Sequence, residues 1–181
     1  LPAVRAIVAA LRAAGVRREV SATIGDWPMA ERAAILERVD AMAATGVDIV
    51  KVGVLPQPGA AELVDALAGR CAAGLAIVPV FIADAPLDLA LVRRALDQHA
   101  PFTAVMADTA DKRGGSLLAR RPAAELARFV ALVRGAGRPV GLAGALQVTD
   151  LPALAALAPD FAGFRSAVCA GDRAAALDPA R

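Results

Sequence analysis

Short apolar segments alternate along the chain with longer segments in which apolar residues recur every three or four positions. The short segments are rich in Val, Ile, Phe and Ala and are typical of buried parallel strands, whereas the longer ones are typical of helices that bury one face. The predicted strands are residues 19–25, 48–54, 75–83, 102–107, 139–144 and 160–166. The predicted helices between them are residues 29–45, 59–73, 87–98, 122–136 and 150–158.

This alternation predicts a single α/β domain over residues 1–181, with parallel strands that are connected by helices. A doubly wound sheet would bind its ligand at one switch point, whereas a barrel collects its chemistry from the ends of many strands. The residues at or just after the strand ends include many polar ones: Ser21, Thr23, Asp26, Lys51, Asp84, Asp108, Thr109, Lys112, Arg165 and Ser166. Because no GxGxxG follows a strand either, the sequence favours a TIM-type (β/α)8 barrel, of which about six β/α units are present.

Composition and charge narrow the class of function. The chain is 57% hydrophobic, but its apolar runs are far shorter than the roughly 20 residues of a membrane-spanning helix, so we expect no membrane partner. Its 20 cations are interleaved with 18 acids and have few aromatic neighbours, which argues against a nucleic-acid partner. Cys71 and Cys169 are isolated in the sequence and predict buried thiols in a reducing cytoplasm. We expect no metal and no cofactor, because no ligand cluster or P-loop is present.

Lysine usage is unusual, because the chain contains 18 arginines but only two lysines, Lys51 and Lys112. Arginine keeps its proton near neutral pH, whereas a desolvated lysine amine can lose its proton, attack a carbonyl or move a proton. Lys112 lies in a polar segment, where chance retention of a surface lysine is the alternative. Lys51 interrupts an apolar strand, and strand alternation places it with Ile49 and Gly53 on the inner face of the barrel. We therefore expect amine chemistry at Lys51.

Five stretches of the sequence resemble the (5-formylfuran-3-yl)methyl phosphate synthases, in the same order and through almost the whole chain. They are VSATIGDWP (20–28), DIVKVG (48–53), MADTADKRGGSLL (106–118), GLAGALQVTDLPALAAL (141–157) and GFRSAVCAGDR (163–173). The resemblance implies a (β/α)8 barrel lyase that condenses two molecules of glyceraldehyde 3-phosphate through a lysine Schiff base, with loss of phosphate and water. It also implies a role in methanofuran biosynthesis and one-carbon metabolism, with a triose phosphate as the small-molecule partner.

The resemblance implies catalytic roles for three residues. Lys51 matches the active-site lysine of the family's KVG strand, and Asp108 and Lys112 match the acid and the lysine of its DTxxK motif. Asp108 at a strand end and Lys112 in the following loop can both reach the barrel mouth, with Gly114 and Gly115 allowing the loop to close. From DTADK alone, the alternative is a surface salt bridge between the two residues.

Phosphate binding is expected in the loops after the last strands, where barrels often offer backbone N–H groups. The segments GLAGAL and GFRSAVC occupy these positions. Their candidates are the amides of Gly144, Ala145, Ser166 and Ala167, together with the charge of Arg165. Tight turn geometry is the alternative explanation for the glycine. The family usually has Ser where this chain has Ala145, and Gly where it has Ser166.

The roles of three other polar residues are predicted less specifically. Asp26 either orients an amine or caps the following turn. Asp84 is expected to be an end-of-strand or capping residue. His99 is expected to cap a helix end or to supply a cation there.

The family resemblance also predicts further sequence upstream. In the family, two strands precede the SATIGD segment, and the second carries the Schiff-base lysine in a DVK motif. This sequence starts after that motif, and a (β/α)8 barrel typically needs about 250 residues. Without the two units, the strands at 19–25 and 160–166 would be unpaired edges. We therefore expect the isolated chain to be unstable or to self-associate as a homo-oligomer.

Two other functions remain open from the sequence. The first is a different lysine-dependent aldolase or an isomerase-like lyase on the same fold, because one barrel fold supports many reactions. The second is a non-catalytic, phosphosugar-binding barrel. Formation of a furan from glyceraldehyde 3-phosphate separates the synthase from both.

Overall fold

Parallel strands form where the apolar segments predict them, although each is shorter than its segment. The computed structural model describes residues 1–98 and 102–169, together with residues 176 and 178; His99 lies outside them. The strands are β1 (Ser21–Thr23), β2 (Ile49–Val54), β3 (Ile77–Ile82), β4 (Val105–Asp108), β5 (Val140–Leu142) and β6 (Phe161–Ala162). Within the described residues they pair in parallel, in the order of the sequence, as one six-stranded sheet.

Helices connect the strands as the periodicity predicts. The α-helices are α1 (Pro2–Ala13), α2 (Arg32–Ala43), α3 (Ala60–Ala72), α4 (Leu89–Leu96), α5 (Leu117–Arg120), α6 (Ala123–Gly135) and α7 (Leu151–Leu157). The described residues also form the short 3-10 helices η1 (Met29–Glu31), η2 (Val148–Asp150) and η3 (Ser166–Val168). Helix α5 was not predicted, and it begins at the side chain of Ser116, whose hydroxyl accepts the backbone N–H of Ala119.

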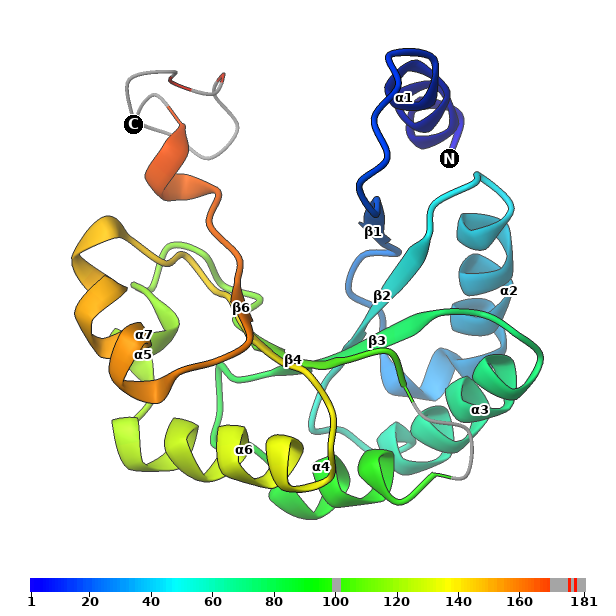
Figure 1. The fold of residues 1–181 in the computed structure, drawn as a ribbon. Coiled ribbons are helices and arrows are strands. Elements are labelled where there is room, and N and C mark those ends of the chain that lie inside the picture. The colour runs from blue at the N-terminus through cyan, green and yellow to red at the C-terminus, as the bar shows by residue number, and fades with distance from the viewer. Residues whose placement is uncertain (99–101, 170–175, 177, 179–181) are drawn as a thin grey trace.

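The sheet curls into a half-barrel that is U-shaped in cross-section (Figure 1). Helices α2, α3, α4, α6 and α7 cover its convex side, and the concave side opens upward in this view. Strands β1 and β6 form the two edges of the described sheet. The alternation of strands and helices therefore does build the barrel-type α/β fold that the sequence favours over a doubly wound sheet.

The apolar core has two layers, one on each face of the sheet. The larger layer lies between the sheet and the helices, and β2 contributes Val50, Val52 and Val54 to it. The smaller layer lines the concave face with Val78, Val80, Ile82, Ala104, Met106 and Ala143, and Ile49 packs against it. The predicted alternation in β2 is thus confirmed, because the valines face the helices and Ile49 faces the concave side.

Helix α1 lies outside the sheet and packs beside α2 (Figure 1). Its Val8 is buried against the turn at Gly46, and Arg5 donates a hydrogen bond to the carbonyl oxygen of Ala44 at 3.1 Å. Leu1 and Ile7 on the same helix are exposed. Among the residues that the structure describes, no helix combines the length and the apolar character needed to cross a membrane.

Two aspartates join the amino-terminal ends of neighbouring strands. Asp48, which precedes β2, accepts the backbone N–H of Val20 at 2.6 Å, and Asp160, which precedes β6, accepts that of Val140 at 2.8 Å. These N–H donors are the largest cause of a lowered pKa in each carboxyl, and the guanidinium groups of Arg12 and Arg134, respectively, add to the effect. Each carboxylate therefore stabilises the start of a strand more strongly when it is ionised.

We expect the stability of the fold to fall at acid pH for this reason. A carboxyl whose pKa is lower in the folded state contributes stability above its unfolded pKa of about 3.9, and this contribution is lost as the pH falls toward the folded value. In the double variant Asp48→Asn/Asp160→Asn, the amide oxygens still accept the N–H groups but do not titrate. Urea unfolding between about pH 6 and pH 2 should show a shallower acid decrease for this variant. Parallel pH profiles for the two proteins would contradict the assignment.

Candidate active site at the carboxyl ends of the strands

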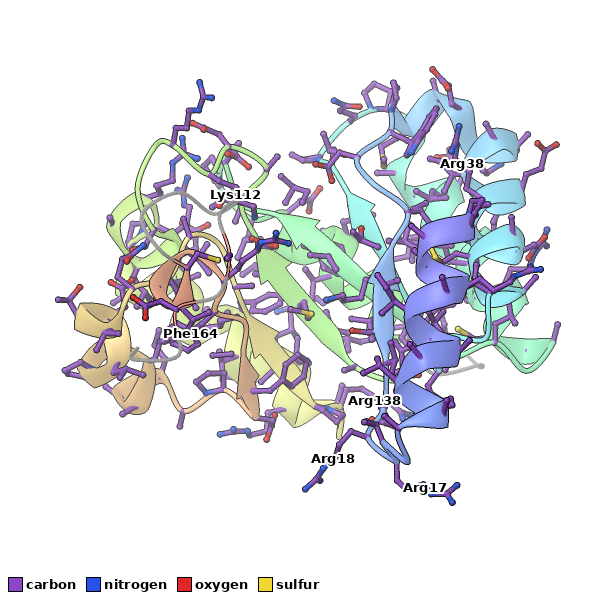
Figure 2. All side chains as sticks on the ribbon, turned by 90° about the horizontal axis from the view of Figure 1, so that it is seen from above. Arg17, Arg18, Arg38, Lys112, Arg138 and Phe164 are labelled. Carbon is purple, nitrogen blue, oxygen red and sulfur yellow. The ribbon has the colours of Figure 1, made fainter. Side chains whose placement is uncertain are left out.

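The carboxyl ends of the strands surround a pocket of about 270 Å³, which we call the mouth pocket. It lies on the concave face, where parallel strands direct all their carboxyl ends to one rim. Its polar lining consists of Thr23, Asp26, Lys51, Asp108, Thr109 and Lys112. All three residues predicted to be catalytic therefore line the same pocket. Figure 2 shows Lys112 at this end of the molecule, opposite Arg17, Arg18 and Arg138 at the other.

Lys51 lies in the middle of β2, beside Thr23 of β1 and Val78 of β3 in the sheet register. Its side chain is half-buried and lines the concave face, as the alternation predicts. Within the described part of the chain, its amine has no hydrogen-bond or ion-pair partner. This amine is therefore available to a ligand in the mouth pocket.

Lys51 also lines a second cavity of about 390 Å³ near the amino-terminal ends of the strands, which we call the floor pocket. The floor pocket is mostly apolar, and Ile49, Val78, Met106 and Phe161 are among its walls. The lysine thus marks the boundary between an apolar cavity below and a polar one above.

Asp108 and Lys112 form an ion pair at the rim of the mouth pocket. The Lys112 ammonium donates to the Asp108 carboxylate and to the carbonyl oxygen of Thr109. The same carboxylate oxygen accepts the backbone N–H of Thr109 at 2.7 Å. The two side chains are only 27% and 20% exposed, respectively, so this pair is not a freely solvated surface salt bridge. A carboxylate and an ammonium that line the same pocket are side chains of the types that act in general acid–base catalysis.

Asp26 also lines the mouth pocket, where it lies close to the strand residue Gly53. A Cβ atom on Gly53 would lie 2.9 Å from the Asp26 carboxylate, so the absence of a side chain at Gly53 leaves room for this carboxylate. Asp26 does not cap the following turn, because the N-cap residue of η1 is Pro28 and no side chain caps this helix. Trp27 fixes the loop, since its indole N–H donates to the carbonyl oxygen of Ile24 at 3.2 Å. Asp26 thus lines the site without capping η1, and its role in orienting an amine stays a prediction.

The predicted phosphate-binding residues lie in the two loops beside the mouth pocket, but they are not among its lining residues. Ala143 and Gly163 line it from the same loops. Gly144 and Ala145 both have positive φ angles, 113° and 47°. The amide segment from Ser166 belongs to the short helix η3. Phosphate binding by Gly144, Ala145, Arg165, Ser166 and Ala167 stays a prediction.

Asp84 and Arg120 form contacts that the sequence reasoning missed. Asp84 follows β3 but caps no helix; its carboxylate accepts two backbone N–H groups from the loop that carries Lys112. Arg120, at the end of α5, forms an ion pair with Asp84 at 2.6 Å and another with Asp111 at 2.9 Å. No sequence signal identifies Arg120, because its partner Asp84 precedes it by 36 positions.

Comparison with solved structures supports the fold. The chain superposes on phosphoribosyl anthranilate isomerase from Thermus thermophilus with a TM-score of 0.60, covering 96% of this chain and 72% of that one. The sequence identity of 20% shows a shared architecture and no more.

Comparison of sequences identifies the family. The family model described as 4-HFC-P synthase matches residues 2–181. A Methylorubrum extorquens protein with a provisional name as (5-formylfuran-3-yl)methyl phosphate synthase is 42% identical over 98% of this chain and 71% of its own length. The (5-formylfuran-3-yl)methyl phosphate synthase of Archaeoglobus fulgidus is 33% identical over 88% of this chain and 72% of its own. The chain therefore belongs to the 4-HFC-P synthase family.

Proposed function

We propose that the protein condenses two molecules of glyceraldehyde 3-phosphate to (5-formylfuran-3-yl)methyl phosphate, with loss of phosphate and water, for methanofuran biosynthesis. One observation carries the proposal: the only two lysines of the chain line one pocket together with Asp108. Membership of a synthase family supports the same reaction class. The pocket volume of about 270 Å³ suits small phosphorylated aldehydes.

The proposed mechanism begins with an iminium between a lysine amine and the carbonyl group of a triose phosphate. The iminium withdraws electrons and acidifies the neighbouring C–H bond, so that a base can remove the proton and generate a nucleophilic carbon. That carbon attacks the second aldehyde. Elimination of phosphate and water, assisted by proton transfers, then forms the furan, and hydrolysis of the imine releases the product and restores the lysine amine.

The proposal divides these steps among the residues of the mouth pocket. Asp108 and Lys112, as a contacting acid–base pair, move protons to and from the reacting carbon and the leaving groups. Lys51 supplies a positive charge or a proton from the wall of the pocket. The family resemblance assigns the iminium to a lysine in a DVK motif, and residues 1–181 contain no such motif. Asp26, which lines the same pocket, would balance the charge of the amines.

The phosphate groups are proposed to bind in the loops after β5 and β6. The backbone N–H groups of Gly144, Ala145, Ser166 and Ala167 would donate to phosphate oxygens, and Arg165 would contribute charge. Ala143 and Gly163, which line the mouth pocket, lead directly into these loops. A triose phosphate whose carbonyl lies near Lys51 would therefore extend its phosphate toward them.

Borohydride trapping tests the Schiff base directly. The protein, including any sequence that precedes Leu1 in its natural gene product, is mixed with glyceraldehyde 3-phosphate and reduced, and its peptides are mapped by mass. We expect a furan product by absorbance and mass, and an adduct on a lysine outside Lys51 and Lys112. An adduct on Lys51 would make it the iminium-forming residue instead. Binding of the triose phosphate without product or adduct would favour a non-catalytic barrel.

Replacing the acid should slow the reaction with little effect on folding. In Asp108→Asn the side chain cannot take up a proton, so kcat should fall about 10²- to 10⁴-fold while KM changes much less. Asp65→Asn is the matched control, because Asp65 also pairs with a cation but does so on the outer surface with Arg94. Steady-state kinetics that show equal kcat values for the two variants would exclude Asp108 from proton transfer.

Gly144 lets the loop after β5 pass close to Asp108, and the importance of this close contact can be tested separately. A Cβ atom there would lie 2.8 Å from the hydroxyl oxygen of Thr109 and 3.1 Å from the Asp108 carboxylate. Gly144→Ala should therefore lose about 1–3 kcal/mol of stability from backbone strain and also reduce kcat by moving Asp108. Gly137→Ala is the control, because Gly137 also has a positive φ, 70°, but has open space around it. Urea unfolding and kinetics should show strain in both variants and loss of kcat only in Gly144→Ala.

A further inference from the structure

We propose that Asp84 and Arg120 are positioning residues that hold the loop of residues 109–115, the Lys112 loop, in the conformation that brings its lysine onto Asp108. The inference rests on the proposed function for its kinetic consequence. Its structural part concerns only the placement of the Lys112 amine. Neither Asp84 nor Arg120 lines the mouth pocket, so both act through the loop.

Asp84 anchors the first half of the Lys112 loop. Its carboxylate accepts the backbone N–H of Ala110 at 2.6 Å and that of Asp111 at 3.0 Å. The two donors are consecutive and immediately precede Lys112. Because Asp84 follows β3, these bonds attach the loop after β4 to the neighbouring strand end.

Arg120, which follows the Lys112 loop in the sequence, binds both Asp84 and Asp111. One guanidinium nitrogen, Nη1, donates to the Asp84 carboxylate at 2.6 Å and to the carbonyl oxygen of Asp111 at 3.1 Å. The other, Nη2, donates to the Asp111 carboxylate at 2.9 Å. The planar guanidinium therefore spans two acids and one carbonyl group, which a lysine ammonium cannot reproduce with the same geometry. Its side chain is only 22% exposed.

These contacts fix the backbone directly before Lys112. The N–H, the carbonyl and the carboxylate of Asp111 are all bonded, to Asp84 or to Arg120. From this fixed point the Lys112 side chain folds back onto Asp108 and the carbonyl oxygen of Thr109. If the contacts of Asp111 were lost, Lys112 could therefore move away from Asp108 although neither Lys112 nor Asp108 had been substituted.

Gly114 is adapted to the guanidinium. A Cβ atom at this position would lie 2.2 Å from Nη2 of Arg120 and 2.7 Å from the Asp111 carboxylate. The guanidinium is the flexible partner and would be the group that moves. Gly114→Ala thus displaces Arg120 from Asp111 while both charged side chains stay in the sequence.

The test observes Lys112 itself by NMR of protein labelled with 13C-lysine, its signal being assigned by its loss in Lys112→Arg. We expect Arg120→Lys, Asp84→Asn and Gly114→Ala each to shift and sharpen the Lys112 side-chain signal, while the Lys51 signal stays in place. In the same variants kcat should fall about 10- to 100-fold, because small misplacements of a reacting group are costly, with KM nearly unchanged. Arg94→Lys is the matched control, since Arg94 forms a similar two-point pair with Asp65 on the outer surface.

The two readouts separate the inference from the proposed function. An unmoved Lys112 signal in both Asp84→Asn and Gly114→Ala would overturn the positioning role, even if the protein makes the furan. A shift in all three variants but not in Arg94→Lys would support it, even if no furan forms from glyceraldehyde 3-phosphate. Equal shifts in the control would mean that any lost ion pair disturbs the loop, which would also overturn the assignment.

Discussion

The register of β2 between β1 and β3 determines where the Lys51 amine lies, and the rest of the site is arranged around that amine. Val50, Val52 and Val54 are drawn to the helix-facing layer because each is almost completely buried there. Lys51, one position away from two of them, must then face the concave side. A shift of one residue would bury the ammonium among apolar helices, where a charge without a partner is strongly unfavourable. Burial of three valines thus secures the position of one catalytic candidate.

The architecture could be predicted from the sequence because two periods alternate along it, and because lysine is scarce enough to mark positions. Strand lengths were overestimated most at the edges: residues 19–25 contain only the three-residue β1, and residues 160–166 only the two-residue β6. An edge strand has one neighbour instead of two, so fewer of its backbone groups find partners and the ladder ends early. Apolar pattern alone does not reveal which strands lie at an edge.

The parts of the site that the sequence did not reveal are those made by contacts between distant residues. Helix α5 has only four residues, which is too few to show the 3.6-residue periodicity of a helix. The one feature of the sequence that indicates it is Ser116, which caps its start. Arg120 resembles any other of the 18 arginines until the fold brings Asp84 and Asp111 to it. Asp108 and Lys112, by contrast, are four residues apart, and their pairing follows from local spacing.

The aspartates that precede β2 and β6 have a consequence for how this fold can change over time. Asp48 and Asp160 fix strand starts at the end of the half-barrel that is opposite the mouth pocket. The alignment of β1 with β2 and of β5 with β6 is therefore supported away from the loops that carry the chemistry. Substitutions in the mouth loops can accumulate without shifting the strands, so selection can alter the substrate while the scaffold is inherited intact.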